Sequence, residues 1–119
     1  MKRSELIQII ESKKSVLCVG LDPDINKLPR SYSPNATGLA RFCKDIIDST
    51  ADHAVAYKPN LAFFESLGSS GWEALAEVAK YLKGFPEHFT IADAKRGDIG
   101  NTSCTDRLVE ERQLWPGSL

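Results

Sequence analysis

The sequence predicts an α/β fold in which helices connect neighbouring parallel strands. Three short apolar segments begin near residues 16, 54 and 89, so they recur about every 35 to 38 residues, with longer segments of helical spacing between them. Polar residues follow the carboxyl end of each apolar segment, which is the edge where α/β folds bind ligands. A doubly wound sheet and a closed barrel both fit this pattern, and three units do not distinguish them.

Composition indicates one ordinary globular domain. The chain has 119 residues, of which 42% are hydrophobic and 26% charged, with a net charge of −1. The balanced charge gives no reason to expect nucleic acid or an anionic membrane as a partner. No apolar run approaches the roughly 18–20 residues of a membrane span, and the N-terminus does not look like a signal peptide, so we expect a cytoplasmic protein.

The cysteines and histidines are too widely spaced to predict a disulfide framework or a zinc site. The three cysteines are Cys18, Cys43 and Cys104, and the two histidines are isolated. No CxxC pair occurs, so reduced thiols are the default and no metal is predicted.

The first half of the chain predicts two helices and one strand. A helical pattern opens at Ser4, which is a plausible N-cap. The apolar run 16–21 is typical of a strand, and three prolines make 22–36 a loop. A second helix is expected over 37–49.

The second half repeats this order. Residues 53–60 predict a strand, 61–67 one or two helical turns, and the Gly-Ser-Ser-Gly segment 68–71 a linker. A third helix is expected from Trp72 to Gly84, and a third strand over 89–94. We expect all three strands to be buried on both faces, as parallel strands usually are.

Charged residues at the strand ends suggest an active site. Asp93 and Lys95 are two positions apart on a strand, so their side chains should point to the same side and hold each other charged. Asp98 follows a turn, while Asp22 and Lys58 come from the neighbouring strand ends. For any one of these charges a solvated loop is the simpler interpretation. An alternating array of carboxylates and ammonium groups suits an enzyme that stabilises a carbanion or moves a proton.

Other catalytic and nucleotide-binding motifs are missing from the sequence. No serine–histidine pairing suggests a nucleophilic triad. Neither a G-x-x-x-x-G-K-[ST] loop nor a G-x-G-x-x-G turn is present, so the motifs do not predict ATP or dinucleotide binding.

Three blocks of the sequence resemble the orotidine 5′-phosphate decarboxylase family, in its longer bacterial branch. They are CVGLDPD (18–24), YKPN (57–60) and DAKRGDIGNT (93–102), and the likeness covers roughly residues 5–103. The last block resembles the family motif D-x-K-x-x-D followed by I-x-x-T. The resemblance implies a (β/α)₈ barrel that works as a homodimer. It also implies cofactor-free loss of CO₂ from orotidine 5′-phosphate, which gives UMP in pyrimidine synthesis.

The resemblance also implies roles for particular residues. Lys95 would donate a proton to C6 of the pyrimidine, and Asp93 would lie near the substrate carboxylate and hold Lys95. Asp22 and Lys58 would bind the ribose hydroxyls. Three further residues would reach into the partner subunit's site: Asp98, Ile99 and Thr102.

A second enzyme class shares part of this motif. Keto-gulonate-phosphate decarboxylase and hexulose-phosphate synthase resemble the same family, share D-x-K-x-x-D, and use Mg²⁺ on an enediolate. Their metal sites need an additional acidic ligand on another strand, and nothing in this sequence clearly supplies it. The segment KRGDIGNT fits the orotidylate enzyme better.

The chain is short for the implied fold. A (β/α)₈ barrel takes about 250 residues, so the sequence would hold about the first three of the eight units of a truncated barrel. We expect 1–103 to be the N-terminal part of a decarboxylase domain. The tail 104–119 lacks the apolar helix that the family would have there, and a frameshift or truncated gene model is our hypothesis for it. We expect the 119 residues alone to be inactive, and the alternative is a non-catalytic fragment or interaction module.

Overall fold

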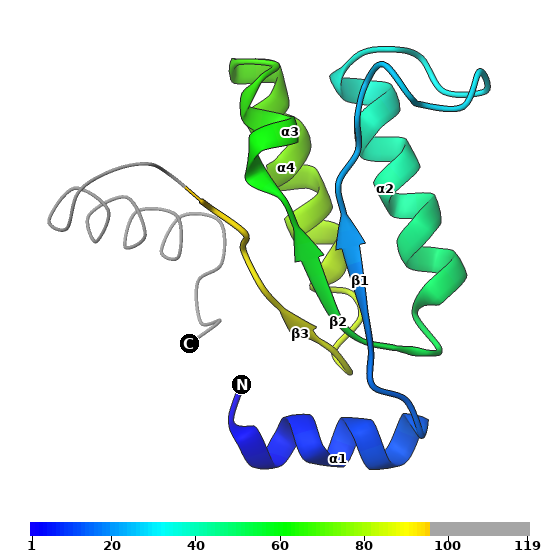
Figure 1. Ribbon diagram of the computed structural model, residues 1–119, viewed down its shortest axis with the longest axis vertical. Coiled ribbons are helices and arrows are strands. Elements are labelled where there is room, and N and C mark those ends of the chain that lie inside the picture. The colour runs from blue at the N-terminus through cyan, green and yellow to red at the C-terminus, as the bar shows by residue number, and fades with distance from the viewer. Residues whose placement is uncertain (96–119) are drawn as a thin grey trace, which may run out of the picture.

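Three parallel strands form the centre of the computed structural model, which describes residues 1–95 (Figure 1). The strands lie in the order β1-β2-β3, and each pairs with the next in parallel. The elements in chain order are α1 (Arg3–Lys13), β1 (Leu17–Leu21), α2 (Ala36–Thr50), β2 (Ala54–Pro59), α3 (Leu61–Glu65), α4 (Ser69–Leu82) and β3 (Phe89–Thr90). The predicted alternation of strands and helices is confirmed. Within residues 1–95, no helix has the length and apolar character needed to cross a membrane.

The two long helices α2 and α4 pack against each other and cover one face of the sheet (Figure 1). Their apolar positions recur at helical spacing, and Leu39, Ile47, Leu75 and Val78 are fully buried. Tyr57 points from β2 into this core, where its hydroxyl donates to the carbonyl oxygen of Ile47 at 3.2 Å. The core therefore fixes which residues of β2 face the helices and which face the opposite side.

The opposite face of the sheet is only partly covered. The prediction that all strands are buried on both faces holds for β2, where every residue except Lys58 is buried. It is wrong for β1, whose Leu17 is 43% exposed, and for the segment after β3, where Ile91 is 37% exposed. The long helices α2 and α4 pack on the other face, and β1 and β3 are the edge strands of the sheet, which explains the exposure.

The third strand is shorter than predicted. Regular pairing stops at Thr90, whereas we expected it to reach residue 94. The segment nevertheless continues beside β2, because the backbone N–H of Ile91 donates to Tyr57 at 2.9 Å and that of Asp93 donates to Pro59 at 3.0 Å. Asp93 is thereby held at the end of β2.

The starts of the helices α1 and α4 differ from the prediction. The helix α1 begins at Arg3, with Lys2 rather than Ser4 at its N-cap. The expected linker 68–71 is mostly helical, because α4 starts at Ser69 directly after Gly68, whose φ of 68° suits glycine. A side chain at Gly71 would place its Cβ 1.7 Å from the carbonyl oxygen of Phe64, so glycine permits the close contact between α3 and α4.

The helix α1 crosses below the amino ends of the strands (Figure 1). The Lys13 ammonium donates to the carbonyl oxygens of Ala51 and Ala54, at 2.8 and 2.9 Å. It thus joins the end of α2 to the start of β2. His88 lies in the same region, with its ring edge-on to Tyr57 at a centroid distance of 5.4 Å.

Acid should destabilise the protein through His88. Burial holds the pKa of His88 below its ordinary value of 6.5, and the charge of Lys13 lowers it further. In the unfolded chain His88 has its ordinary pKa. The stability that the folded protein gains from a neutral His88 is therefore complete above about pH 6.5 and is lost as the pH falls through the pKa of the folded state. We expect the free energy of unfolding in urea to decrease from about pH 7 to about pH 5.

The variant His88→Phe should lose this part of the pH dependence. The exposed His53 provides the matched control, and His53→Gln should keep it. An unchanged pH dependence in His88→Phe would contradict the assignment.

Candidate active site

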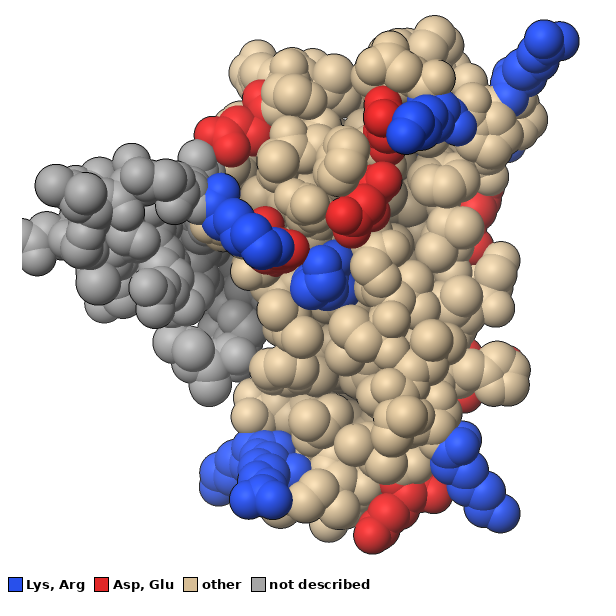
Figure 2. Space-filling view, viewed as in Figure 1, with Lys and Arg blue, Asp and Glu red and all other residues tan. Residues whose placement is uncertain are grey.

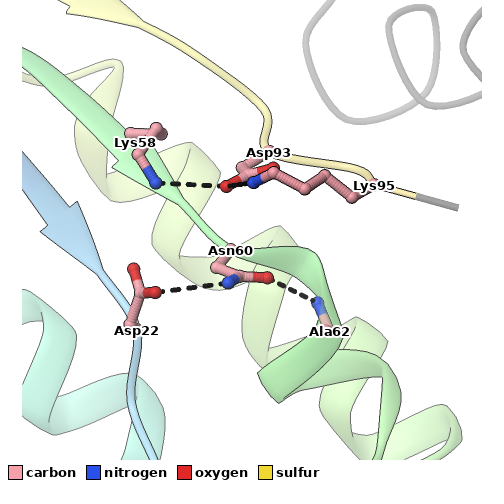
Figure 3. A network of polar contacts seen from close by, with 6 residues as sticks. All are labelled: Asp22, Lys58, Asn60, Ala62, Asp93 and Lys95. Atoms are coloured by element: carbon pink, nitrogen blue, oxygen red, sulfur yellow. Dashed lines mark hydrogen bonds and ion pairs between the residues drawn. The ribbon is translucent and has the colours of Figure 1, made fainter.

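Three charged side chains meet at the carboxyl end of the strands (Figure 3). The Lys58 ammonium lies 3.1 Å from Oδ2 of Asp93, and the Lys95 ammonium donates to both carboxylate oxygens of Asp93. We call Lys58, Asp93 and Lys95 the charged cluster. The side chain of Asp93 is 9% exposed, while that of Lys95 is 83% exposed. The carboxylate is therefore held within the protein, and one of its two ammonium partners lies mostly in solvent.

Strand alternation directs Lys58 to this cluster. Successive side chains of a strand point to opposite faces, and because Tyr57 points into the helical core, Lys58 points to the other face. Its partner in the β1–β2 register is Gly20, which has no side chain there. A Cβ at Gly20 would lie 3.2 Å from Oδ1 of Asp22, so glycine also leaves room for the Asp22 carboxylate.

The charges of the cluster stabilise one another. The hydrogen bond from Lys95, followed by that from Lys58, holds the pKa of Asp93 below its ordinary value. The hydrogen bond to Asp93 raises the pKa of Lys58 despite the opposing effect of burial, and the charge of Asp22 adds to the increase. Asp93 is therefore a carboxylate at neutral pH and Lys58 an ammonium ion. Since both lysines are exposed to solvent, these ion pairs contribute little to the stability of the fold. Their main effect is to fix the positions of the charged groups at the ends of the strands.

Asp22, at the end of the neighbouring strand, is bound by Asn60. The Asn60 side-chain amide donates to Oδ2 of Asp22 at 3.2 Å, and its oxygen accepts from the backbone N–H of Ala62, also at 3.2 Å (Figure 3). Asn60 belongs to the YKPN block but was not among the predicted site residues. Its position directly before an apolar helical run is the N-cap signal that could have identified it.

The structure brings four of the predicted site residues to one edge of the sheet. They are Asp22, Lys58, Asp93 and Lys95. The other three, Asp98, Ile99 and Thr102, lie outside the described residues. Figure 2 shows positive and negative side chains close together on the upper part of this face, whereas its centre below them carries no charge. Charged side chains also lie at the lower end of this face, so the uncharged centre separates the charged group at the carboxyl ends of the strands from those at the opposite end.

The described residues show no obvious site for a metal ion. Between residues 1 and 95, no three His, Cys, Asp or Glu side chains form a group that could hold a metal ion. Cys43 is buried, which raises the pKa of its thiol to about 12, and Cys18 is an exposed free thiol.

The fold and the cluster together define a class of enzyme-like α/β proteins. Sequentially ordered parallel strands, with helices on one face and charged groups at the carboxyl edge, are the arrangement of a (β/α)-barrel site. The chain belongs to the orotidine 5′-phosphate decarboxylase / HUMPS family, whose family model matches residues 15–105.

Curated relatives and a solved structure agree with this assignment. The chain is 52% identical over 105 residues to orotidine 5′-phosphate decarboxylase of Bacteroides fragilis, a match that covers 87% of the chain and 38% of that relative. It is 53% identical over 104 residues to the enzyme of the same name from Parabacteroides distasonis, covering 87% of the chain and 37% of the relative. The structure of Leishmania donovani OMP decarboxylase matches with a TM-score of 0.70 and 35% identity, over 92% of this chain and 41% of that one.

The chain therefore spans about two fifths of the length of the proteins it matches. The predicted fold class, the first three βα units of a TIM barrel, is confirmed by these matches together with the sheet. The open choice between a doubly wound sheet and a barrel is thus decided in favour of the barrel.

Replacing Asp93 should lower the pKa of Lys58. In Asp93→Asn the principal group that raises the pKa of Lys58 is gone, while the burial that lowers it remains, so this pKa should fall. The measurement is an NMR titration of the Lys58 side chain in the 119-residue protein.

The matched control is Asp45→Asn, which removes a carboxylate that bonds Tyr32 on the helical side. It should leave the Lys58 titration unchanged. An equal titration of Lys58 in Asp93→Asn and in the unaltered protein would show that the ion pair does not form.

Proposed function

We propose that this chain supplies the first part of an orotidine 5′-phosphate decarboxylase site. The reaction is the loss of CO₂ from orotidine 5′-phosphate to give UMP, without a cofactor. The observation that carries the proposal is the charged cluster, in which two ammonium groups share one carboxylate at the carboxyl end of parallel strands. Family membership and the names of the curated relatives support it.

Lys95 is the proposed proton donor. When the bond between C6 and the carboxylate breaks, its electron pair stays on C6 of the pyrimidine as a carbanion. The Lys95 ammonium, paired with Asp93, supplies positive charge close to this carbanion and then transfers a proton to C6. Lys95 ends the step as a neutral amine. Its high exposure leaves it free to approach a bound substrate.

Asp93 has two proposed tasks. It holds Lys95 in place through hydrogen bonds, and it places a negative charge near the carboxylate of the substrate. The lowered pKa of Asp93 supports both tasks, because a protonated acid would do neither. Lys58 and Asp22 are proposed to bind the ribose hydroxyls, since they lie next to the cluster and can donate and accept hydrogen bonds.

The remaining assignments concern the larger assembly. We propose a cytoplasmic homodimer. Three residues would reach the partner subunit's site, namely Asp98, Ile99 and Thr102. Residues 1–103 would form the start of the barrel domain, and 104–119 would be a separate tail.

Two alternatives have different consequences. The matched family carries a joint name, so a Mg²⁺-dependent sugar-phosphate reaction is the second candidate enzyme activity. A non-catalytic interaction module is the candidate outside enzymology. Decarboxylation that survives chelation would favour our proposal over the Mg²⁺-dependent reaction. Catalysis that depends on Lys95 would favour it over the non-catalytic module.

The test is a chimaera in which residues 1–105 replace the matching region of the Parabacteroides distasonis enzyme. We expect UMP formation with EDTA present. We also expect Lys95→Ala to lower kcat at least about 100-fold, because a general acid usually contributes that much. The matched control is Lys80→Ala, an exposed lysine of α4, which should retain activity. The 119-residue chain alone should not produce UMP.

Three results would contradict the proposal. The first is a folded chimaera without activity. The second is activity that is lost in EDTA and restored by Mg²⁺, and the third is a Lys95→Ala variant within about tenfold of the unaltered chimaera.

A further inference from the structure

Asn60 lies where all three strands end. Its backbone N–H donates to the carbonyl oxygen of Leu21 at 3.0 Å, which joins it to the end of β1. The next N–H, that of Leu61, donates to the carbonyl oxygen of Asp93 at 3.1 Å and completes a bridge to the segment after β3. The backbone at Asn60 is therefore fixed relative to both neighbouring strand ends.

The side chain of Asn60 is fixed as well. The first N–H groups of a helix have no carbonyl partner within the helix, and Asn60 caps α3 by accepting from Ala62. Because a backbone N–H can only donate, the amide oxygen must face Ala62. The amide nitrogen must then face the other way, towards Asp22 (Figure 3). The helix cap thus sets the direction of the donor.

The rest of the surroundings of Asp22 leave the direction of its carboxylate unrestrained. Residue 22 is exposed and begins a long loop after β1. Its Oδ1 lies over Gly20, which has no side chain to confine it. The amide of Asn60 contacts Oδ2 at 3.2 Å and leaves Oδ1 directed to the same face as Lys58.

We propose that Asn60 is a positioning residue that orients the Asp22 carboxylate towards the sugar hydroxyls of the substrate. This inference rests on the proposed function, since it assumes that Asp22 binds the ribose. Asn60 does not touch the reacting atoms, and it acts through Asp22. Its removal should weaken substrate binding more than it slows the chemical step.

Two variants separate this role from the helix cap. Serine and aspartate are both good N-caps, so Asn60→Ser and Asn60→Asp keep the acceptor for Ala62 but lose the amide N–H that donates to Asp22. Asn60→Asp also places a second carboxylate beside Asp22. In the chimaera, we expect Asn60→Ser to raise KM for orotidine 5′-phosphate about tenfold, as the loss of a hydrogen bond to a charged group predicts, with kcat within about threefold. Asn60→Asp should raise KM further.

The matched control is Asn26→Ser, in the exposed loop after β1, which should leave KM unchanged. An unaltered KM in both Asn60 variants would overturn the proposal. So would a parallel loss of kcat and thermal stability, because that result would indicate a purely structural cap.

A second measurement uses the 119-residue protein and does not require activity. The side-chain amide protons of Asn60, observed by NMR, should exchange faster with water in Asp22→Ala than in the unaltered protein, and their chemical shifts should change. Unchanged exchange and shifts would overturn the positioning role whatever the chimaera does. If the unaltered chimaera is inactive while the Asn60 signals respond to Asp22→Ala, the proposed function fails but the orientation of Asp22 by Asn60 stands.

Discussion

The ionised carboxylate of Asp93, held between Lys58 and Lys95, is the interaction on which the candidate site depends. Two ammonium groups on one sheet face would repel each other without a negative charge between them. With Asp93 in place, the pKa of the carboxyl is lowered, that of Lys58 is raised, and both remain charged at neutral pH. The fold contributes by fixing Asp93 beside the end of β2 through backbone hydrogen bonds to Pro59 and Leu61.

The rest of the structure positions this cluster. The helices α2 and α4 bury Tyr57 on one face of β2, and strand alternation then directs Lys58 to the other face. Gly20 has no side chain, so it leaves room for the Asp22 carboxylate on the same face of the sheet as Lys58. The backbone of Asn60 connects the ends of the three strands. The helical core is thus apolar and closely packed, while the charged cluster lies at the carboxyl edge. This separation is the usual arrangement of a barrel enzyme, in which stability and chemistry lie in different layers.

Sequence reasoning was strongest where periodicity and strand ends carry the signal. The alternating elements and the proximity of Asp93 to Lys95 follow from helical spacing, strand alternation and a separation of two residues. Prediction from the sequence failed where contacts between distant parts of the chain determine the structure. The exposure of β1 depends on which strands lie beside it, and the helical start at Ser69 depends on the contact of Gly71 with α3. The N-cap position of Asn60 is visible in the sequence, but its hydrogen bond to Asp22 could not be predicted, because Asp22 lies 38 positions away.

The most direct test of the account is the titration of the Asp93 side-chain carboxyl, followed by carbon-13 NMR in the 119-residue protein. The account predicts a pKa below the ordinary aspartate value of 3.8, and a rise in that pKa when Lys95 is replaced by methionine, since Lys95 is the largest cause of the lowering. A carboxyl that titrates at or above its ordinary value, and that does not respond to Lys95→Met, would contradict the charged cluster and the chemistry proposed for it.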